Sequence, residues 1–165
     1  MAQDTGQLVS PPATTTPPEL KAPPAPRLRL APGQAGRGVM DGGWWPRSRD
    51  AVAELTDLLT ALTALAGAGE PPAAATRVTI DFDDWDEVPL RITVLGREIG
   101  VGWLAYRDHM VAITCGRAAP TMLLVVPPGA SSSSAEAALA RSAVEAGDTL
   151  PQEILASCDI FTRRV

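Results

Sequence analysis

The sequence predicts an α+β protein in which a largely antiparallel sheet of about five or six strands carries two main helices packed on one face. Three observations predict this class: an amphipathic helical pattern that ends near residue 66, a series of strand-like segments between residues 77 and 126, and an alanine-rich helical segment at 135–146. Strands that follow one another without intervening helices favour antiparallel pairing. We expect a single domain at 27–147 and a loosely held C-terminal tail at 148–165.

The composition fits a soluble globular protein, with 45% apolar and 20% charged residues in 165. The formal net charge of -5 makes nucleic acid an unlikely partner, although a local basic cluster could still bind an anion. Neither a signal peptide nor an apolar stretch near the ~18 residues of a membrane span is found. We therefore expect a cytoplasmic location, no membrane contact and reduced thiols at Cys115 and Cys158.

The chain begins with a segment that is poor in large apolar residues. Residues 1–26 contain Pro-Pro three times and a run of threonines, so we expect a disordered tail with polyproline character. Residues 27–30 form a short strand candidate. Gly33, Gly36 and Gly38 then mark a loop.

The first helix is predicted from its cap and its periodicity. Ser48 is a natural N-cap, and Asp50 lies in the first turn, where a negative charge favours the helix dipole. Gly67 ends the pattern. The expected apolar stripe comprises Val52, Leu55, Leu58, Leu59, Leu62, Leu65 and Ala66, with Glu54, Asp57 and Ala61 on the opposite side.

The middle of the chain alternates as half-buried strands do, at 78–82, 90–94, 99–103 and 111–115. Gly96 and Arg97 suit a two-residue hairpin turn with glycine first. The predicted register places Val94 opposite Ile99, Ile92 opposite Val101 and Leu90 opposite Trp103. A slip by two residues would keep the same faces buried, so this register stays open.

An unbroken apolar run at 122–126 predicts a central strand that is covered on both faces. Pro127, Pro128 and Gly129 end this strand. Serines 131–134 form a polar linker and supply an N-cap for the alanine-rich helix at 135–146, which Gly147 ends.

The segment from Gly42 to Asp50 is the first candidate site. Trp45 precedes Pro46 and is therefore biased to an extended conformation, which sends the Trp44 and Trp45 side chains to opposite sides of the chain. Arg47 and Arg49 flank the helix N-terminus, which attracts anions. Trp44, Trp45, Arg47 and Arg49 are thus candidate ligand-binding residues. The favoured interpretation of the segment is nevertheless structural: both indoles close the core, and the arginines pair with Asp41, Asp50 or the acidic run at 81–87.

The acidic run is the second candidate site, because clustered carboxylates can hold magnesium or calcium. The spacing of residues 81–92 does not fit an EF-hand loop, and a solvated turn that pairs with arginines is the favoured interpretation. His109 is the only histidine, and Cys115 lies about 20 Å along the same strand, too far for a dyad. The candidates for acid–base chemistry or metal binding are Asp81, Asp83, Asp84 and His109; no resident metal or cofactor is predicted.

Several blocks together resemble an uncharacterised family of short actinobacterial proteins, catalogued as domain of unknown function 5994. They lie at residues 27–30, 41–50, 83–89, 96–97, 108–109 and 123–128, and the Asp-Gly-Gly-Trp-Trp-Pro-Arg-Ser segment is the most distinctive. The resemblance spans roughly residues 27–146. It implies a small intracellular protein with no established activity or cofactor, and it carries no catalytic residues over to this chain.

The sequence favours a small non-catalytic binding or regulatory domain that presents Trp44 or Trp45 with Arg47 and Arg49 to an anionic small molecule or a protein partner. One alternative is a small enzyme that uses carboxylates of residues 81–86 with His109. Another is a structural homo-oligomer.

Overall fold

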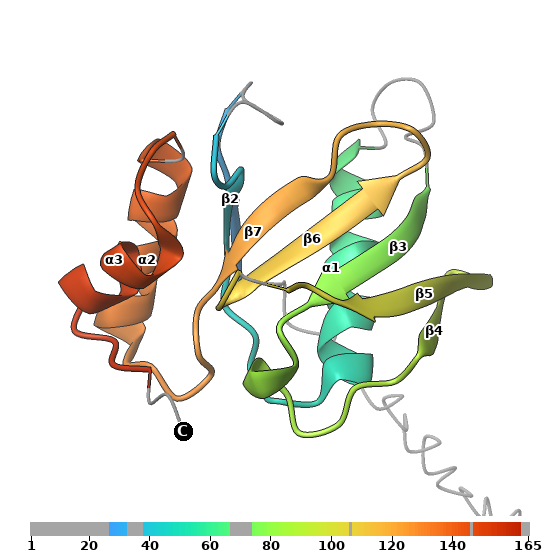
Figure 1. The fold of residues 1–165 in the computed structure, drawn as a ribbon, viewed down its shortest axis with the longest axis horizontal. Coiled ribbons are helices and arrows are strands. Elements are labelled where there is room, and N and C mark those ends of the chain that lie inside the picture. Colours follow the sequence, from blue (N-terminus) through green and yellow to red (C-terminus); the bar gives the residue numbers. More distant parts are fainter. Residues whose placement is uncertain (1–26, 33–37, 67–73, 106, 146, 163–165) are drawn as a thin grey trace, which may run out of the picture.

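The computed structural model describes residues 27–32, 38–66, 74–105, 107–145 and 147–162. Figure 1 shows the elements around one twisted sheet. In chain order they are β1 (Leu28–Leu30), β2 (Gly42–Trp44), α1 (Ala51–Ala66), β3 (Ala75–Ile80), the 3₁₀ helix η1 (Phe82–Asp84), β4 (Arg91–Val94), β5 (Arg97–Trp103), β6 (Met110–Cys115), β7 (Thr121–Val125), α2 (Ser132–Val144) and α3 (Pro151–Ser157).

The sheet has seven strands in the order β1-β2-β7-β6-β3-β5-β4. It is mixed, because β2 pairs with β7 and β3 pairs with β5 in parallel, whereas the prediction was a largely antiparallel sheet of five or six strands. The chain passes from β3 through η1 to the outer position and returns by the β4–β5 hairpin, so that β5 lies beside β3 and runs in the same direction. Sequence order alone does not reveal such an insertion.

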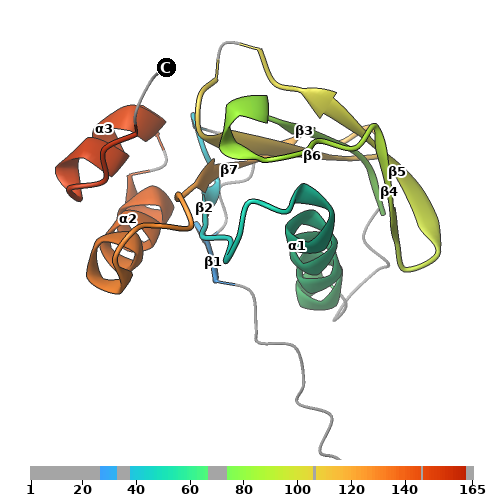
Figure 2. The ribbon, with the colours of Figure 1, turned by 90° about the horizontal axis from the view of Figure 1, so that it is seen from below.

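The helices cover both faces of the sheet, and the prediction of one covered face is wrong. Figure 2 shows α1 against the face of the larger part of the sheet and α2 and α3 on the far side of β1 and β2. The alternation of β7 explains the two layers: Leu123 and Val125 join the core under α1, while Leu124 and Val126 join the core under α2 and α3. The prediction that β7 is covered on both faces is confirmed.

Helix α1 is confirmed, but it begins later and is turned differently from the prediction. Asp50 is the N-cap in place of Ser48, because its Oδ1 accepts a hydrogen bond from Ala53 N at 3.2 Å. Ser48 Oγ instead donates to Glu54 Oε1 at 2.8 Å, and this contact helps to bury Glu54. The buried stripe is Ala51, Leu55, Leu58 and Leu59, whereas Val52 and Leu65 are exposed.

The β4–β5 hairpin is confirmed with a register two residues away from the predicted one. Ile92 pairs with Ile99 and Val94 with Arg97. The turn is Leu95-Gly96, with φ values of 50° and 76°, a pair that places glycine second rather than first. Because the shift is two residues, Ile92, Val94, Ile99 and Val101 still face α1.

The C-terminal part packs on the second core. Ser131 Oγ accepts from Ser134 N and caps α2, as predicted, and α3 buries Ile154 and Leu155 completely or nearly so. The domain limits remain a prediction, and the tail predicted for residues 1–26 lies outside the described residues. Both cysteines are free thiols. Among the described helices, none combines the length and the apolar character needed to cross a membrane.

Candidate functional site

The two tryptophans of the first candidate site point to opposite faces of the sheet, as predicted, and both are buried. Trp44 is 2% exposed and stacks on Trp85 with ring centroids 5.6 Å apart, in the core under α1. Trp45 is 6% exposed in the second core, with the Arg27 guanidinium 3.3 Å above its ring centroid. The indole nitrogen of Trp45 is buried and has no hydrogen-bond partner among the described residues. A ligand cannot reach Trp44 without displacing the core.

The neighbouring residues hold strands and a helix close together. A Cβ on Gly42 would lie 2.1 Å from the carbonyl oxygen of Arg29 on β1, and a Cβ on Gly43 would lie 2.3 Å from Ser142 Oγ on α2. Asp41 Oδ2 accepts a hydrogen bond from Met122 N at 2.8 Å. We call residues 41–46 the tryptophan block, and its contacts show that it joins β1, β2, β7 and α2.

Of the two arginines that follow the block, Arg49 is held by the acidic run. Arg49 Nε donates to Asp86 Oδ1 at 2.9 Å, and Nη2 donates to the carbonyl oxygen of Asp83 at 3.0 Å. Arg47 is exposed. The four predicted ligand-binding residues therefore do not converge, and Arg49 instead lies beside the acidic run.

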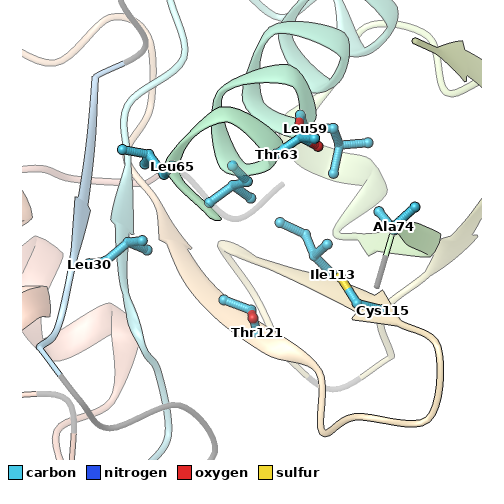
Figure 3. A pocket seen from close by; sticks show the side chains of 10 residues that line it. Leu30, Leu59, Thr63, Leu65, Ala74, Ile113, Cys115 and Thr121 are labelled. Carbon is cyan, nitrogen blue, oxygen red and sulfur yellow. Dashed lines mark hydrogen bonds between the residues drawn. The ribbon is translucent and has the colours of Figure 1, made fainter. Parts of the chain in front are cut away.

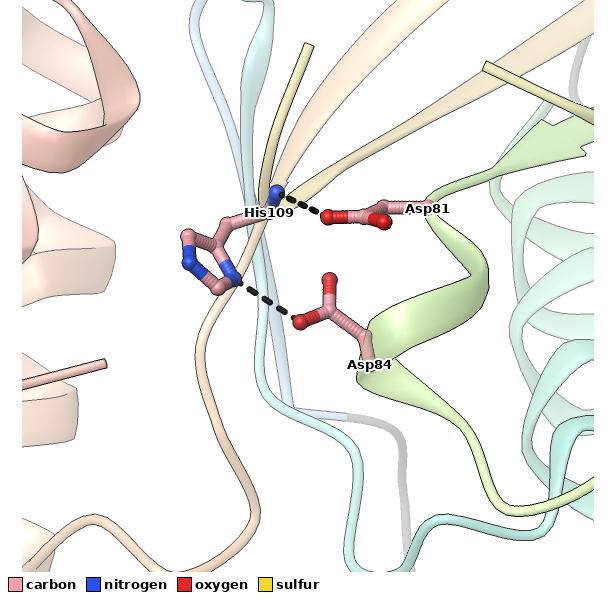
Figure 4. Close-up of side chains that lie close together, drawn as sticks. All are labelled: Asp81, Asp84 and His109. Carbon is pink, nitrogen blue, oxygen red and sulfur yellow. Dashed lines mark hydrogen bonds and ion pairs between the residues drawn. The ribbon is translucent and has the colours of Figure 1, made fainter. Parts of the chain in front are cut away.

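The structure brings together three of the four residues of the second candidate site. Asp81 follows β3 and caps η1, Asp84 ends η1, and His109 precedes β6. Strands β3 and β6 are antiparallel neighbours, so the end of one meets the start of the other. One ligand atom from each of Asp81, Asp84 and His109 lies within 4.8 Å of the other two (Figure 4). We call this trio the acidic corner; Asp83 is exposed and is not part of it.

Asp81 has a structural role within the acidic corner. Its Oδ1 accepts a hydrogen bond from Asp83 N at 3.2 Å, and its Oδ2 accepts one from His109 N at 3.1 Å. The side chain therefore fixes both the start of η1 and the backbone that carries the imidazole. Only 8% of Asp81 is exposed.

Asp84 and His109 form a pair that is largely shielded from solvent. His109 Nδ1 lies 2.8 Å from Asp84 Oδ1, and the two side chains are 15% and 12% exposed, respectively. Asp84 Oδ2 is buried and has no hydrogen-bond partner among the described residues. Figure 4 shows this second oxygen directed toward the Asp81 carboxylate. A buried carboxylate oxygen without a donor is costly, and it calls for a proton or a cation.

The surroundings of the pair raise the pKa of both Asp84 and His109. Burial raises the pKa of Asp84, and the charge of Asp81 adds to this, while the hydrogen bond and charge of His109 act in the opposite direction. Burial alone would lower the pKa of His109. The hydrogen bond to Asp84 and the charges of Asp84, Asp81 and Asp108 outweigh it, so the pKa of His109 is raised.

A pocket of about 370 Å³ opens beside the acidic corner. Its polar wall carries Arg49, Asp83, Asp84 and His109, and the other lining residues are apolar except for Thr162. We call it the corner pocket; its remaining lining residues are Pro46, Val125, Pro127, Pro128, Phe161 and Thr162.

The sequence did not point to the apolar wall of the corner pocket. Strands β2, β3 and β7 run in the same direction, so their carboxyl ends lie on the same side of the sheet. Pro46, Asp81 and Pro127 all follow these ends. Ligands in mixed and parallel sheets commonly lie beyond the carboxyl ends of strands. The Pro127-Pro128 pair after a central strand is the signal that could have indicated this wall, but its use required the strand order.

A second hollow, of about 300 Å³, lies between the end of α1 and strands β1, β6 and β7 (Figure 3). Leucines 30, 59, 62 and 65 and Ile113 make it apolar, and none of its described lining residues is charged. Burial raises the pKa of the Cys115 thiol there, which disfavours the reactive thiolate. This hollow lacks groups for acid–base chemistry.

The acidic corner offers two kinds of chemistry. With Nδ1 held by Asp84, Nε2 of His109 remains for proton exchange with a ligand. Two carboxylates and an imidazole are also ligands for divalent metals. In the described part of the chain, no other group of three histidine, cysteine or acidic residues comes this close together.

A family model matches residues 27–142, and its description is a family of unknown function (DUF5994). The match covers β1 through most of α2 and includes both the tryptophan block and the acidic corner. No curated protein and no solved structure matches the chain.

Proposed function

We propose that the chain, which belongs to the DUF5994 family of unknown function, is a small-molecule-binding protein whose ligand occupies the corner pocket. The observation that carries the proposal is the Asp84–His109 pair, which is largely buried yet lines this pocket. Buried ion pairs contribute little net stability because desolvation offsets their attraction. Ionisable groups with shifted pKa values in a pocket are therefore better explained by binding or chemistry.

The lining of the corner pocket indicates the kind of ligand. Its volume lies at the lower end of the range for small-molecule sites, about 300–1,000 Å³. Proline, valine and phenylalanine side chains suit an apolar body, and the polar wall suits a group that exchanges hydrogen bonds with Asp84, His109 and Arg49. Arg49 is already held by Asp86 and by the Asp83 carbonyl, which lowers the entropy cost of using its remaining N–H groups.

A thermal-shift screen tests this function directly. The purified protein is melted with nucleotides, phosphorylated metabolites, organic acids and amines, each tested separately. A ligand at about a hundred times its dissociation constant adds roughly 2.7 kcal/mol, which amounts to several degrees for a chain of this size.

Three variants locate the ligand. Arg49→Gln and His109→Asn should remove the shift, and asparagine suits position 109 because φ is 57° there. Arg91→Gln is the matched control, since Arg91 pairs with Glu98 away from the corner pocket. A shift that persists in both corner variants would place the ligand elsewhere, and the absence of any shift would count against binding.

A catalytic role is the second candidate, and the orientation of His109 favours it. Asp84 accepts the hydrogen bond from Nδ1, the arrangement that leaves Nε2 for general acid–base catalysis. Turnover of an identified ligand by wild type would establish this role if its kcat is lost in His109→Asn even when the ligand concentration is raised until the variant is saturated.

A further inference from the structure

We propose that the acidic corner is a divalent metal site in which Asp81, Asp84 and His109 each provide one ligand atom. The inference deepens the proposed function and rests on it only for location, because the metal would form the polar floor of the corner pocket. Three observations support it: the spacing of the ligand atoms, the unpartnered oxygen of Asp84, and the charge of the group.

The spacing is close to that of a coordination sphere. At metal–ligand distances of about 2.0–2.2 Å, two ligand atoms at a right angle lie about 3 Å apart. His109 Nδ1 and Asp84 Oδ1 are 2.8 Å apart, and one ligand atom from each of Asp81, Asp84 and His109 lies within 4.8 Å of the other two. A metal that replaces the proton between Nδ1 and Oδ1 therefore demands only small movements.

The unpartnered oxygen is the observation that points independently to a bound cation. Asp84 Oδ2 is fully buried, lacks a donor among the described residues and is directed toward a second carboxylate (Figure 4). Two neighbouring carboxylates with one imidazolium leave a net charge of about -1 in a poorly solvated place. A divalent cation balances both carboxylates, with a neutral imidazole as the third ligand.

Asp81 is already oriented for coordination. The N–H groups of Asp83 and His109 each hold one of its two oxygens, and each carboxylate oxygen retains a further lone pair. Hydrogen bonds of this kind fix the ligand carboxylates of metal sites and tune their affinity. Burial of Asp81 thus serves both the backbone and the metal.

The ligand set selects a metal of the zinc class. Calcium takes six to eight oxygen ligands, and magnesium retains several waters, so neither suits a largely buried group of two carboxylates and one imidazole. Zinc accepts mixed oxygen and nitrogen ligands, and three protein ligands leave a fourth position for water or for a ligand in the corner pocket. With Nδ1 bound to zinc, activation of that water would replace proton transfer by the ring.

Calorimetric titration with Zn²⁺ tests the site in the full chain, prepared without a histidine tag and dialysed against EDTA and then metal-free buffer. Co²⁺ absorption provides a second readout, because visible bands report nitrogen and oxygen coordination. We expect one equivalent to bind wild type, and Asp84→Asn and His109→Asn to weaken binding at least about 100-fold. Asp83→Asn, which removes an exposed neighbouring carboxylate, should bind as wild type does.

Every outcome decides the proposal. Binding that is unchanged in Asp84→Asn would overturn it in favour of a surface site, and no saturable binding to wild type would mean that Asp84 Oδ2 carries a proton. Melting in EDTA shows whether each variant is folded, and if His109→Asn fails to fold, Asp84→Asn decides alone. The small-molecule screen repeated in EDTA separates the two proposals: a ligand shift in EDTA together with no saturable Zn²⁺ binding would retain the pocket and reject the metal.

Discussion

The tryptophan block and the acidic corner are both buried groups of chemically distinctive side chains, yet their interactions differ. In the tryptophan block, Trp44 and Trp45 fill two cores, and Asp41 satisfies a backbone N–H. The indole N–H groups of Trp45 and Trp85 have no described partner, but a neutral donor costs only about 1–3 kcal/mol. In the acidic corner, the unpartnered atom belongs to a carboxylate that faces another carboxylate.

This difference separates packing from function. Close packing of strands, helix α2 and aromatic rings accounts for the glycines and tryptophans of the tryptophan block. Packing does not account for the burial of Asp84 Oδ2 without a partner. A buried carboxylate oxygen without a partner, such as Asp84 Oδ2, is expected to persist only where it is used. On this comparison we propose a structural role for the tryptophan block and functional roles for Asp84 and His109.

Trp44→Ala should have the largest effect on stability. Removal of an indole that is 2% exposed and stacked on Trp85 should cost about 3–5 kcal/mol of the free energy of unfolding, measured by urea denaturation. Trp103→Ala is the matched control, because Trp103 is 65% exposed and should change stability by less than about 0.5 kcal/mol. Equal losses in the two variants would break the structural account of the tryptophan block.

Gly43→Ala tests the close approach of α2 to β2. The new methyl group would meet Ser142 Oγ at 2.3 Å and Leu139 Cδ2 at 3.1 Å, so we expect a loss of about 1–3 kcal/mol in the same assay. The double variant Gly43→Ala/Ser142→Ala should recover part of this loss, because the nearest atom is removed. Strict additivity would show that the two residues do not limit the approach.

Asp81→Asn sharpens the comparison inside the acidic corner. The Asp81 carboxylate accepts two backbone hydrogen bonds, whereas an amide can accept only through its oxygen. We therefore expect the free energy of unfolding to fall by about 1–3 kcal/mol, seen as a lower melting temperature. Asp83→Asn should be nearly neutral. A neutral Asp81→Asn would mean that Asp81 is not needed to hold the His109 backbone.

Arg49→Gln should have the smallest effect on stability, at most about 1 kcal/mol, because its ion pair with Asp86 is solvent-exposed. Arg91→Gln breaks the exposed pair with Glu98 and should lower the free energy of unfolding, measured by urea denaturation, as little as Arg49→Gln does. Only Arg49→Gln should weaken binding in the corner pocket. If both variants leave binding unchanged, Arg49 is not a recognition group.

The elements were predictable where local pattern determines them. Periodicity identified α1, alternation and turn residues identified β4 and β5, and the apolar run identified β7. In the observed register, Ile92 pairs with Ile99. The alternation of apolar and polar residues could not distinguish this register from one shifted by two residues, because both bury the same side chains.

The candidate site was predictable only as a set of residue types. Asp84 and His109 lie far apart in the sequence and meet because β3 and β6 are neighbours, which follows from the strand order. The sequence also left open whether Trp44 and Trp45 are core residues or ligand contacts, because an aromatic pair has the same sequence pattern whether it is buried or exposed. The placement of each ring depends on which faces of the sheet the helices cover.

Melting of wild type and Asp84→Asn in EDTA and in Zn²⁺ tests the central claim most directly, namely that the acidic corner is a site rather than part of the packing. In EDTA, Asp84→Asn should be close to wild type in stability, because the amide oxygen still accepts the hydrogen bond from His109 Nδ1 and the amide N–H groups offer Asp81 a donor. In Zn²⁺, wild type should gain several degrees and Asp84→Asn should gain none, so that wild type melts higher. If Asp84→Asn melts below wild type by the same amount in both buffers, the carboxylate is structural and the claim fails.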